Sequence, residues 1–498
     1  MDEDERVFIS LSVRRQWIVL LLVGMVLLGV IAPIIAAPPA DIGTRRELFL
    51  DHYLIEQLDG TELRLHRPTS AGIAIKFDKP WEGIYAAYAT VLHDGAKYRM
   101  YYRGHPGGGD DGSEVETTCY AESDDGITWI KPELGLFEVM GTKQNNVVLA
   151  HDMPFSHNLS PFLDTRPGVP PAEKYKALAG LSTSNLFAYV SPDGIHWRKW
   201  RDRPVFTDTG WVFDSQNVAF WSDHEQCYVL YYRKTPGEIR SVARTTSTDF
   251  ENWSKPETTA FSSCPPTIDE QLYTNQTTLY FRAPHLAIAT AARFMPGRKG
   301  LTGEQLQQLG IDAENWLGHD TSDVVLMSTR DGRTYDRLFP QAFVPPGEDA
   351  KNWTSRGNYP ACGIVQTGPR EMSIYVQRNY GWPSHYLERL TMRVDGFSSV
   401  EAGHKPGRMI TRLFAFAGDR LEINAATSAA GEIRVEIQDE QGKTMDGYSA
   451  AECEPIIGDE IARVVSWKSA SVSSLAGKPV RLVFHLKEAD LYSIRFTE

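Results

Sequence analysis

An alternating pattern of apolar and polar residues, rich in tyrosine, recurs along the first four-fifths of the chain. Four segments carry it: K-Y-R-M-Y-Y-R at 97–103, K-Y-K-A-L-A-G at 174–180, C-Y-V-L-Y-Y-R at 227–233 and E-M-S-I-Y-V-Q-R at 371–378. Alternation over this length is typical of a β-strand with one buried face. The pattern therefore predicts four equivalent strands, each at the same place in a repeated unit.

A turn motif follows these strands. It reads S-D-D-G-I-T-W at 123–129, S-P-D-G-I-H-W at 191–197, S-T-R-D-G-R-T-Y at 328–335 and, without the glycine, S-T-D-F-E-N-W at 247–253. An Asp-Gly pair supplies the positive backbone angles of a tight hairpin, and Ser and Asp side chains bind the turn's own amides. We therefore assign Asp125, Asp193 and Asp331 to turns and not to catalysis.

The two patterns together predict a repeated four-stranded unit. Inner strand, tyrosine-rich strand, third strand, turn and outer strand return at intervals of roughly 55 to 80 residues, about the length of one propeller blade. Five such units occur, at 81–140, 150–206, 210–262, 268–346 and 355–400. The segment 48–75 precedes them and is expected to supply the strand that closes the ring. The sequence thus predicts an all-β chain with a five-bladed β-propeller at 41–402.

Two segments depart from the repeat. Residues 296–320 lengthen the fourth unit and contain a helical pattern at 301–309, with Thr302 in position to cap the helix. After Phe397 the turn motif disappears, and alternating strands are separated by glycine-containing turns. This change predicts a separate β-sandwich at 403–498.

The N-terminus has a different character from the rest. Arg14 and Arg15 precede an apolar run at 17–37, which is long enough to span a bilayer. Residues 1–40 are therefore expected to be a cleaved signal peptide or a retained membrane anchor, and both alternatives stay open. In either case the remainder is expected to be exported to the periplasm or the cell exterior, with membrane contact through this segment alone.

Charge and cysteine content exclude several functions. The formal net charge is −13 and no long basic run follows the N-terminal segment, so nucleic acid is not an expected partner. The five cysteines are scattered without a C-x-x-C pair, which argues against a zinc site or a dense disulfide framework. We expect no cofactor and no metal.

The five-blade count, the tyrosine-rich second strand and the S-x-D-G-x-x-W turn resemble the propellers of glycoside hydrolase families 32, 43 and 68. The C-terminal sandwich is similar to that of family 32. Sialidase propellers also carry Asp-containing turns, but one residue separates their Asp from the Gly, whereas the two are adjacent here. The resemblance implies a carbohydrate substrate.

The resemblance also implies acidic residues that project from inner strands into an axial funnel. Glycosidic cleavage needs one carboxyl group to protonate the leaving oxygen and another to attack the sugar or activate water. Glu82, in W-E-G, is the candidate nucleophile or base, and Asp214, in F-D-S-Q-N, is the candidate general acid. The family motifs are not literal here, and an extra acidic pair, Asp269 and Glu270, is a further catalytic candidate.

Polar residues near the starts of the inner strands are candidates for binding sugar hydroxyls. They are His157, Asn158, Asn217, Arg356, Asn358 and Tyr359. Each could instead be satisfied within the fold, and His157 could approach an axial ion or water. Trp81, Trp211 and Trp382 could stack on sugar faces or fill the core between blades.

Three functions remain open at this point. The first is an exported glycoside hydrolase acting on a poly- or oligosaccharide. The second is a carbohydrate-binding propeller without catalysis. The third is phosphorolysis or glycosyl transfer, for which two or more Arg, Lys or His side chains beside the acid are expected.

Overall fold

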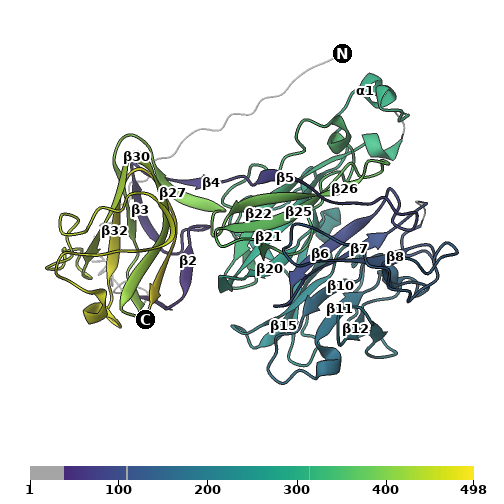
Figure 1. Ribbon diagram of the computed structural model, residues 1–498, viewed down its shortest axis with the longest axis horizontal. Helices are drawn as coiled ribbons and strands as arrows, with labels where there is room; N and C mark the ends of the chain where they lie inside the picture. The colour runs from purple at the N-terminus through teal and green to yellow at the C-terminus, as the bar shows by residue number, and fades with distance from the viewer. Residues whose placement is uncertain (1–38, 108–109, 313–314) are drawn as a thin grey trace, which may run out of the picture. The chain divides into compact units, whose positions relative to one another are not determined.

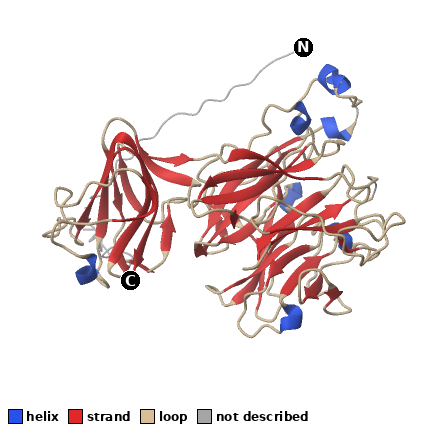
Figure 2. Cartoon of the chain, in the orientation of Figure 1, coloured by secondary structure: helices blue, strands red, loops and turns tan. Residues whose placement is uncertain are grey.

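The computed structural model describes residues 39–107, 110–312 and 315–498, which form mainly β-strands (Figure 2). Within these ranges the only α-helix is α1 (Gly303–Gln308), in the predicted insertion. Thr302 caps it, because its side chain accepts a hydrogen bond from the Gln305 amide. The predicted signal or anchor lies outside the described residues. No helix in the described part has the length and apolar character needed to cross a membrane.

Four antiparallel sheets in chain order form the first four blades (Figure 1). Blade one contains β6 (Ala87–His93), β7 (Tyr98–Gly104), β8 (Thr117–Ser123) and β9 (Val147–Leu149). Blade two contains β10 (Ser160–Leu163), β11 (Tyr175–Ala179), β12 (Phe187–Ser191) and β13 (Arg198–Lys199). Blade three contains β14 (Val218–Ser222), β15 (Cys227–Lys234), β16 (Ser241–Ser247) and β17 (Glu257–Thr258). Blade four has an inner position divided between β19 (Gln271–Thr274) and β20 (Thr277–Tyr280), followed by β21 (Ala283–Met295) and β22 (Thr321–Thr329).

The fifth blade closes the ring. It contains β24 (Val365–Gln366), β25 (Glu371–Arg378), β26 (Tyr386–Arg393) and, as its outer strand, β5 (Thr69–Lys76). Because β5 comes from the segment before blade one, both ends of the propeller sequence meet in this sheet. The inner strands also contact one another around the axis, β6 with β10, β10 with β14, β14 with β20 and β24 with β6. The five-bladed propeller and its closure by the early segment are confirmed.

Hydrogen bonds join each of the three Asp-Gly turns to a tyrosine of a neighbouring blade. The hydroxyl groups of Tyr375, Tyr101 and Tyr231 donate to the carbonyl oxygens of Gly126, Gly194 and Gly332, respectively. Within the first turn, Asp125 Oδ1 accepts from the amides of Ile127 and Thr128 at 2.7 and 2.8 Å. The Asp-Gly motifs are therefore structural, and the tyrosine-rich strands supply the other half of each contact.

Strands from both ends of the described chain build a second β unit. Its large sheet contains β27 (Ser398–Ala402), β28 (Gly407–Thr411), β30 (Arg420–Gln438), β31 (Asp459–Val464) and β32 (Arg481–Thr497), joined by β2 (Arg46–Leu48), β3 (Ile55–Asp59) and β4 (Glu62–Leu65). In addition, β1 (Ala40–Gly43) pairs with β29 (Phe414–Phe416). The strand pairing thus assigns residues 40–65 to the second unit and not to the propeller expected at 41–402, because Ile42, Phe49 and Leu54 pack into the same apolar core as the C-terminal strands.

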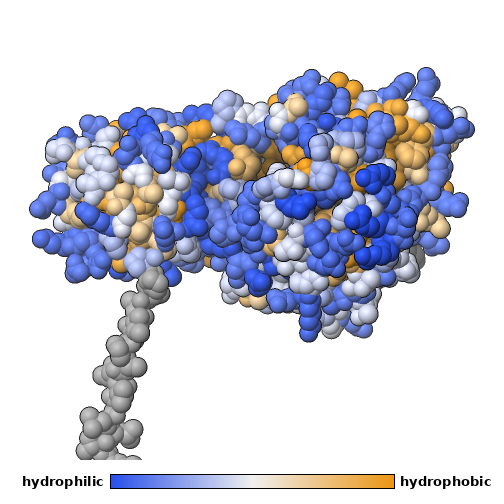
Figure 3. Space-filling view, turned by 90° about the horizontal axis from the view of Figure 1, so that it is seen from below, coloured by the Kyte–Doolittle hydropathy of each residue, from blue (hydrophilic) through white to orange (hydrophobic). Residues whose placement is uncertain are grey.

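On the face drawn in Figure 3, hydrophilic residues predominate.

Candidate active site

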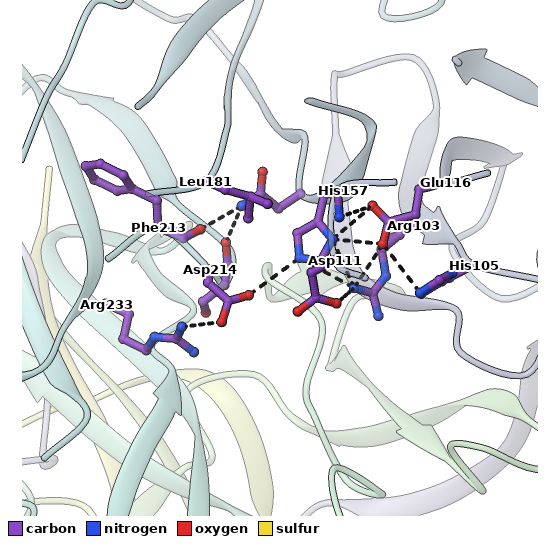
Figure 4. Close-up of polar contacts among 12 residues, drawn as sticks. Arg103, His105, Asp111, Glu116, His157, Leu181, Phe213, Asp214 and Arg233 are labelled. Atoms are coloured by element: carbon purple, nitrogen blue, oxygen red, sulfur yellow. Dashed lines mark hydrogen bonds and ion pairs between the residues drawn. The ribbon is translucent and has the colours of Figure 1, made fainter. Parts of the chain in front are cut away.

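Five buried or half-buried ionisable side chains form a row of alternating charge at one end of the propeller (Figure 4). Asp214 Oδ2 accepts a hydrogen bond of 2.7 Å from Arg233, and Asp214 Oδ1 lies 3.7 Å from His157 Nε2. His157 Nδ1 lies 2.9 Å from Glu116 Oε1, and Arg103 Nη1 lies 3.8 Å from the same oxygen. Each charged group in the row therefore has a neighbour of opposite sign.

The strand order explains why these residues meet. In an antiparallel blade, the start of the inner strand, the end of the second strand and the start of the third strand lie at the same end of the sheet. Arg103 and Arg233 lie near the ends of the second strands β7 and β15, each in a Y-Y-R sequence, and Glu116 directly precedes β8. His157 and Asp214 lie shortly before the inner strands β10 and β14. All five consequently belong to the same end of blades one to three.

A pair of glutamines lies beneath this row, close to the axis. Gln276 donates to the side-chain oxygen of Gln216 and to the carbonyl oxygen of Pro360, and Gln216 donates to the carbonyl oxygen of Ala89. Further along the inner strands, residues such as Val91 and Phe220 line an apolar cavity of about 240 Å³. The polar chemistry is therefore confined to one end of the propeller axis.

Asp214 is held in its ionised form. Burial opposes the charge, but His157 and Arg233 outweigh burial and lower the pKa of the Asp214 carboxyl far below its usual range. Its Oδ1 atom is buried without a hydrogen-bond partner. A carboxylate that resists protonation suits a nucleophile or a base better than a proton donor. The geometry thus supports a different role for Asp214 from the general acid that the sequence suggested.

His157 is the cation between two carboxylates. Burial alone would lower the pKa of its imidazole, but the interactions with Asp214 and Glu116 raise it above the usual value, against an opposing contribution from Arg103. The Tyr88 ring packs edge-on against His157 at 5.5 Å between centroids. These four residues come from blades one and three and surround the imidazole, which precedes the inner strand of blade two.

A pH dependence of stability follows from the raised pKa of His157. A group whose pKa is higher in the folded state contributes stability below its unfolded pKa of about 6.5 and loses that contribution as pH rises through the folded value. We expect the difference in unfolding free energy between wild type and His157→Gln to be larger at about pH 6 than at about pH 9. Urea unfolding at both pH values measures it, with exposed His224→Gln as the control. A difference independent of pH would contradict the charged state of His157.

A second carboxylate faces Asp214. The Asp111 side chain is half exposed. One of its carboxylate oxygens, a ring nitrogen of His157 and a carboxylate oxygen of Asp214 all lie within 4.8 Å of one another. Asp111 lines two adjoining hollows, which share Asp111, Arg356 and Tyr380. The larger has a volume of about 660 Å³, enough for a saccharide unit. Asp111 therefore brings an acid to the space where a substrate can bind.

The other three predicted catalytic carboxylates lie outside this row. Glu82 is fully buried and bound by the Tyr102 hydroxyl at 2.6 Å and by Lys131 Nζ at 2.7 Å, so its charge is satisfied inside blade one. Asp269 is exposed, and Glu270 pairs with Arg337 and, at 3.5 Å, with Arg293. We therefore do not retain Glu82, Asp269 and Glu270 as catalytic candidates.

The six predicted sugar-binding residues divide into two groups. The amide of Asn158 donates to the carbonyl oxygens of Gly180, Phe213 and Ser215, and the amides of Asn217 and Asn358 likewise bind backbone carbonyls. These three asparagines hold the approaches to the inner strands. His157 belongs to the charged row, while Arg356 and Tyr359 line the smaller hollow.

Of the three predicted stacking tryptophans, one is available to a ligand. Trp81 and Trp382 are buried in apolar clusters, whereas the Trp211 side chain is 49% exposed. Trp316, from the insertion in blade four, lines the larger hollow and is also partly exposed. Trp316 is therefore a tryptophan of the larger hollow that a sugar could contact, and Trp211 is exposed outside the two hollows.

Two sets of three side chains have the composition of a metal site. They are His105, Asp111 and Glu116, and Asp111, His157 and Asp214. Imidazole and carboxylate ligands suit divalent transition metals. However, the guanidinium of Arg103 already lies 3.8 Å from both Asp111 and Glu116. This cation neutralises the same carboxylates, so we assign no metal to them.

Comparison with known proteins finds structural resemblances of low similarity and no match in sequence. No protein-family model and no curated protein sequence matches the chain. Solved structures that resemble it include a glycoside hydrolase family 43 arabinoxylan arabinofuranohydrolase from Bacillus subtilis (TM-score 0.38, 11% identity, covering 86% of this chain and 99% of that one) and a fructofuranosidase from Schwanniomyces occidentalis (TM-score 0.37, 11% identity, 85% and 96%). An N-acetylgalactosamine deacetylase from F. plautii also matches (TM-score 0.43, 12% identity, 67% and 96%). The expected likeness to glycosidase propellers is found, but similarity at this level carries no assignment of activity.

Proposed function

We propose that the protein is an exported glycoside hydrolase. The observation that carries the proposal is the pair of carboxylates, Asp214 and Asp111, whose oxygens lie within 4.8 Å of each other, with Asp111 lining the larger hollow. Two such groups are the minimum equipment for cleaving a glycosidic bond. Export rests on the sequence of residues 14–37 alone.

The two carboxylates would have different tasks. Asp214 stays ionised next to Arg233 and His157, and its Oδ1 has no hydrogen-bond partner, so this oxygen would attack the anomeric carbon. Asp111, which is half exposed and faces the hollow, would protonate the leaving oxygen and then deprotonate the water that releases the sugar. Glu116 would act as a positioning residue, because it accepts a hydrogen bond from His157 Nδ1, and Arg103 would in turn pair with Glu116 at 3.8 Å.

The spacing predicts the stereochemical outcome. Carboxyl groups about 5 to 5.5 Å apart belong to retaining glycosidases, whereas inverting ones need about 6.5 to 9.5 Å to admit a water. We expect a screen of residues 41–498 against diverse polysaccharides to find a substrate whose product keeps its anomeric configuration, as followed by proton NMR. An inverted product would exclude Asp214 as the nucleophile.

Phosphorolysis is the second candidate, because Arg233 and His157 both lie beside Asp214. Phosphate would then replace water, and the product would be a sugar 1-phosphate. Repeating the reaction with and without phosphate separates the two, since hydrolysis gives free reducing sugar in both conditions. The non-catalytic binding module has less support, because the funnel contains more than one carboxylate.

A further inference from the structure

Three arginines surround one tyrosine ring next to the row of charges. The guanidinium carbons of Arg233, Arg240 and Arg356 lie 5.0, 5.2 and 5.6 Å from the ring centroid of Tyr273. They come from blade three, the connection that follows β15 and the loop before blade five. Arg356 and Tyr273 both line the smaller hollow. Positive charge is therefore concentrated at one wall of the candidate site.

These arginines have more hydrogen-bond donors than acceptors around them. In the part of the chain that the structure describes, Asp214 is the one carboxylate that forms an ion pair with any of the three, through Arg233. Arg233 Nε and Nη1, Arg240 Nε and Arg356 Nε are buried without a hydrogen-bond partner. Buried donors are normally satisfied, so these unpaired N–H groups call for an acceptor that the protein itself does not supply.

Aromatic rings hold the guanidinium groups without using their donors. The Trp211 ring lies 4.9 Å from the guanidinium carbon of Arg233 and 4.6 Å from that of Arg240, and the Trp316 ring lies 4.9 Å from that of Arg356. A cation over a ring face gains electrostatic attraction while its N–H edge stays free. The partly exposed tryptophans thus contact the guanidinium groups without using their N–H donors.

The two neighbouring cations affect the ionisation of Arg240. Burial lowers the pKa of the Arg240 guanidinium; Tyr273 and Tyr359 raise it, and the neighbouring cations Arg233 and Arg356 lower it. Like charges at this spacing destabilise one another in a medium of low dielectric constant. A bound anion would relieve both the repulsion and the unpaired donors.

We propose that Arg240 and Arg356, together with the free edge of Arg233, bind an oxyanion. This inference deepens the proposed function and rests on it: the group would be a carboxylate or sulfate on an acidic saccharide whose scissile bond reaches Asp214. Inorganic phosphate offers the same chemistry and is the other source of the anion. Planar guanidinium groups match both kinds of oxyanion with paired hydrogen bonds.

Titration calorimetry measures the affinity of this site for anions without requiring turnover of a substrate. The probes are galacturonate, inorganic phosphate and, as the uncharged counterpart, galactose, all titrated into the 41–498 chain at constant ionic strength. We expect at least one anion to bind at least about tenfold more tightly than galactose, and Arg356→Gln and Arg240→Gln each to weaken that binding at least about tenfold. Exposed Arg298→Gln, in blade four, serves as the matched control and should leave it unchanged.

Further variants and substrates separate the possible outcomes. Arg356→Lys keeps the charge and should retain part of the affinity that Arg356→Gln loses, with circular dichroism confirming that each variant is folded. Tighter binding of galacturonate indicates a group on the substrate, and tighter binding of phosphate together with sugar 1-phosphate formation indicates free phosphate. Anion binding that survives both glutamine substitutions, or no anion binding, overturns the site. Hydrolysis confined to neutral polysaccharides would overturn the oxyanion site and leave the proposed hydrolase function intact. Anion binding without hydrolysis of any substrate would overturn the hydrolase function and leave the oxyanion site intact.

Discussion

Replacing Asp214 with asparagine is expected to lower the rate of glycoside cleavage by about 10³-fold or more, because an amide can neither attack the anomeric carbon nor act as a base. The native carboxylate is prepared for that task by Arg233 at 2.7 Å and by the cationic His157. Asparagine keeps the size of the side chain and can still accept the hydrogen bond from Arg233. The loss should therefore appear in kcat, with substrate binding largely preserved.

The control for this variant is Asp269→Asn. Asp269 is an acidic residue that the sequence also suggested for catalysis, but the structure leaves it exposed and outside the charged row. We expect activity within about twofold of wild type, as is usual for a surface substitution remote from a site. If Asp269→Asn abolished cleavage while Asp214→Asn did not, the chemistry would have to be assigned to blade four.

The propeller could be predicted because its signals are local. Each Asp-Gly turn satisfies its own amides, and each tyrosine-rich strand alternates within seven or eight residues, so a short window of sequence contains the whole cause. The regular spacing then fixed the number of blades. In blade three the glycine is replaced by Phe250, yet the turn persists because Asp249 still accepts from the amides of Glu251 and Asn252.

The pairing of the two chain ends could not be predicted in the same way. Strands β2, β3 and β4 are short, and their partners lie more than 300 residues away in the sequence. Their apolar residues are too few to identify a partner, since any exposed strand edge would satisfy them equally well. Only the packing of Phe49 and Leu54 into the C-terminal core determines where they belong.

The candidate site was predictable where polarity conflicted with an inner-strand position. Asp214, His157 and Arg356 could be identified because charged side chains do not contribute to the apolar packing of the blades. Asp111 was missed, since it follows a run of glycines that resembles an ordinary flexible loop. Arg103 and Arg233 carried a signal that could have identified them, because both end a Tyr-Tyr-Arg sequence at equivalent places in two blades.

Substituting Glu82 with glutamine is expected to reduce the stability of the protein by about 3 kcal/mol, because it leaves the Lys131 ammonium ion without its buried counter-charge. The Glu82 side chain is fully buried and also binds the Tyr102 hydroxyl and the Lys79 amide. Asp78, 3.1 Å from Lys131, is exposed and compensates for only part of the loss. The midpoint of urea unfolding measures the effect.

The same variant decides whether Glu82 has any part in catalysis. At a temperature where Glu82→Gln remains folded, we expect cleavage within a few-fold of wild type, since the Glu82 carboxylate pairs with Lys131 and Tyr102 and not with the charged row. Glu133→Gln, an exposed substitution in the same blade, should alter neither stability nor rate. The contrary result is a folded Glu82→Gln protein that loses as much activity as is expected for Asp214→Asn. That result would return Glu82 to the role of nucleophile, because a buried residue outside the row could cause so large a loss only by taking part in the chemistry.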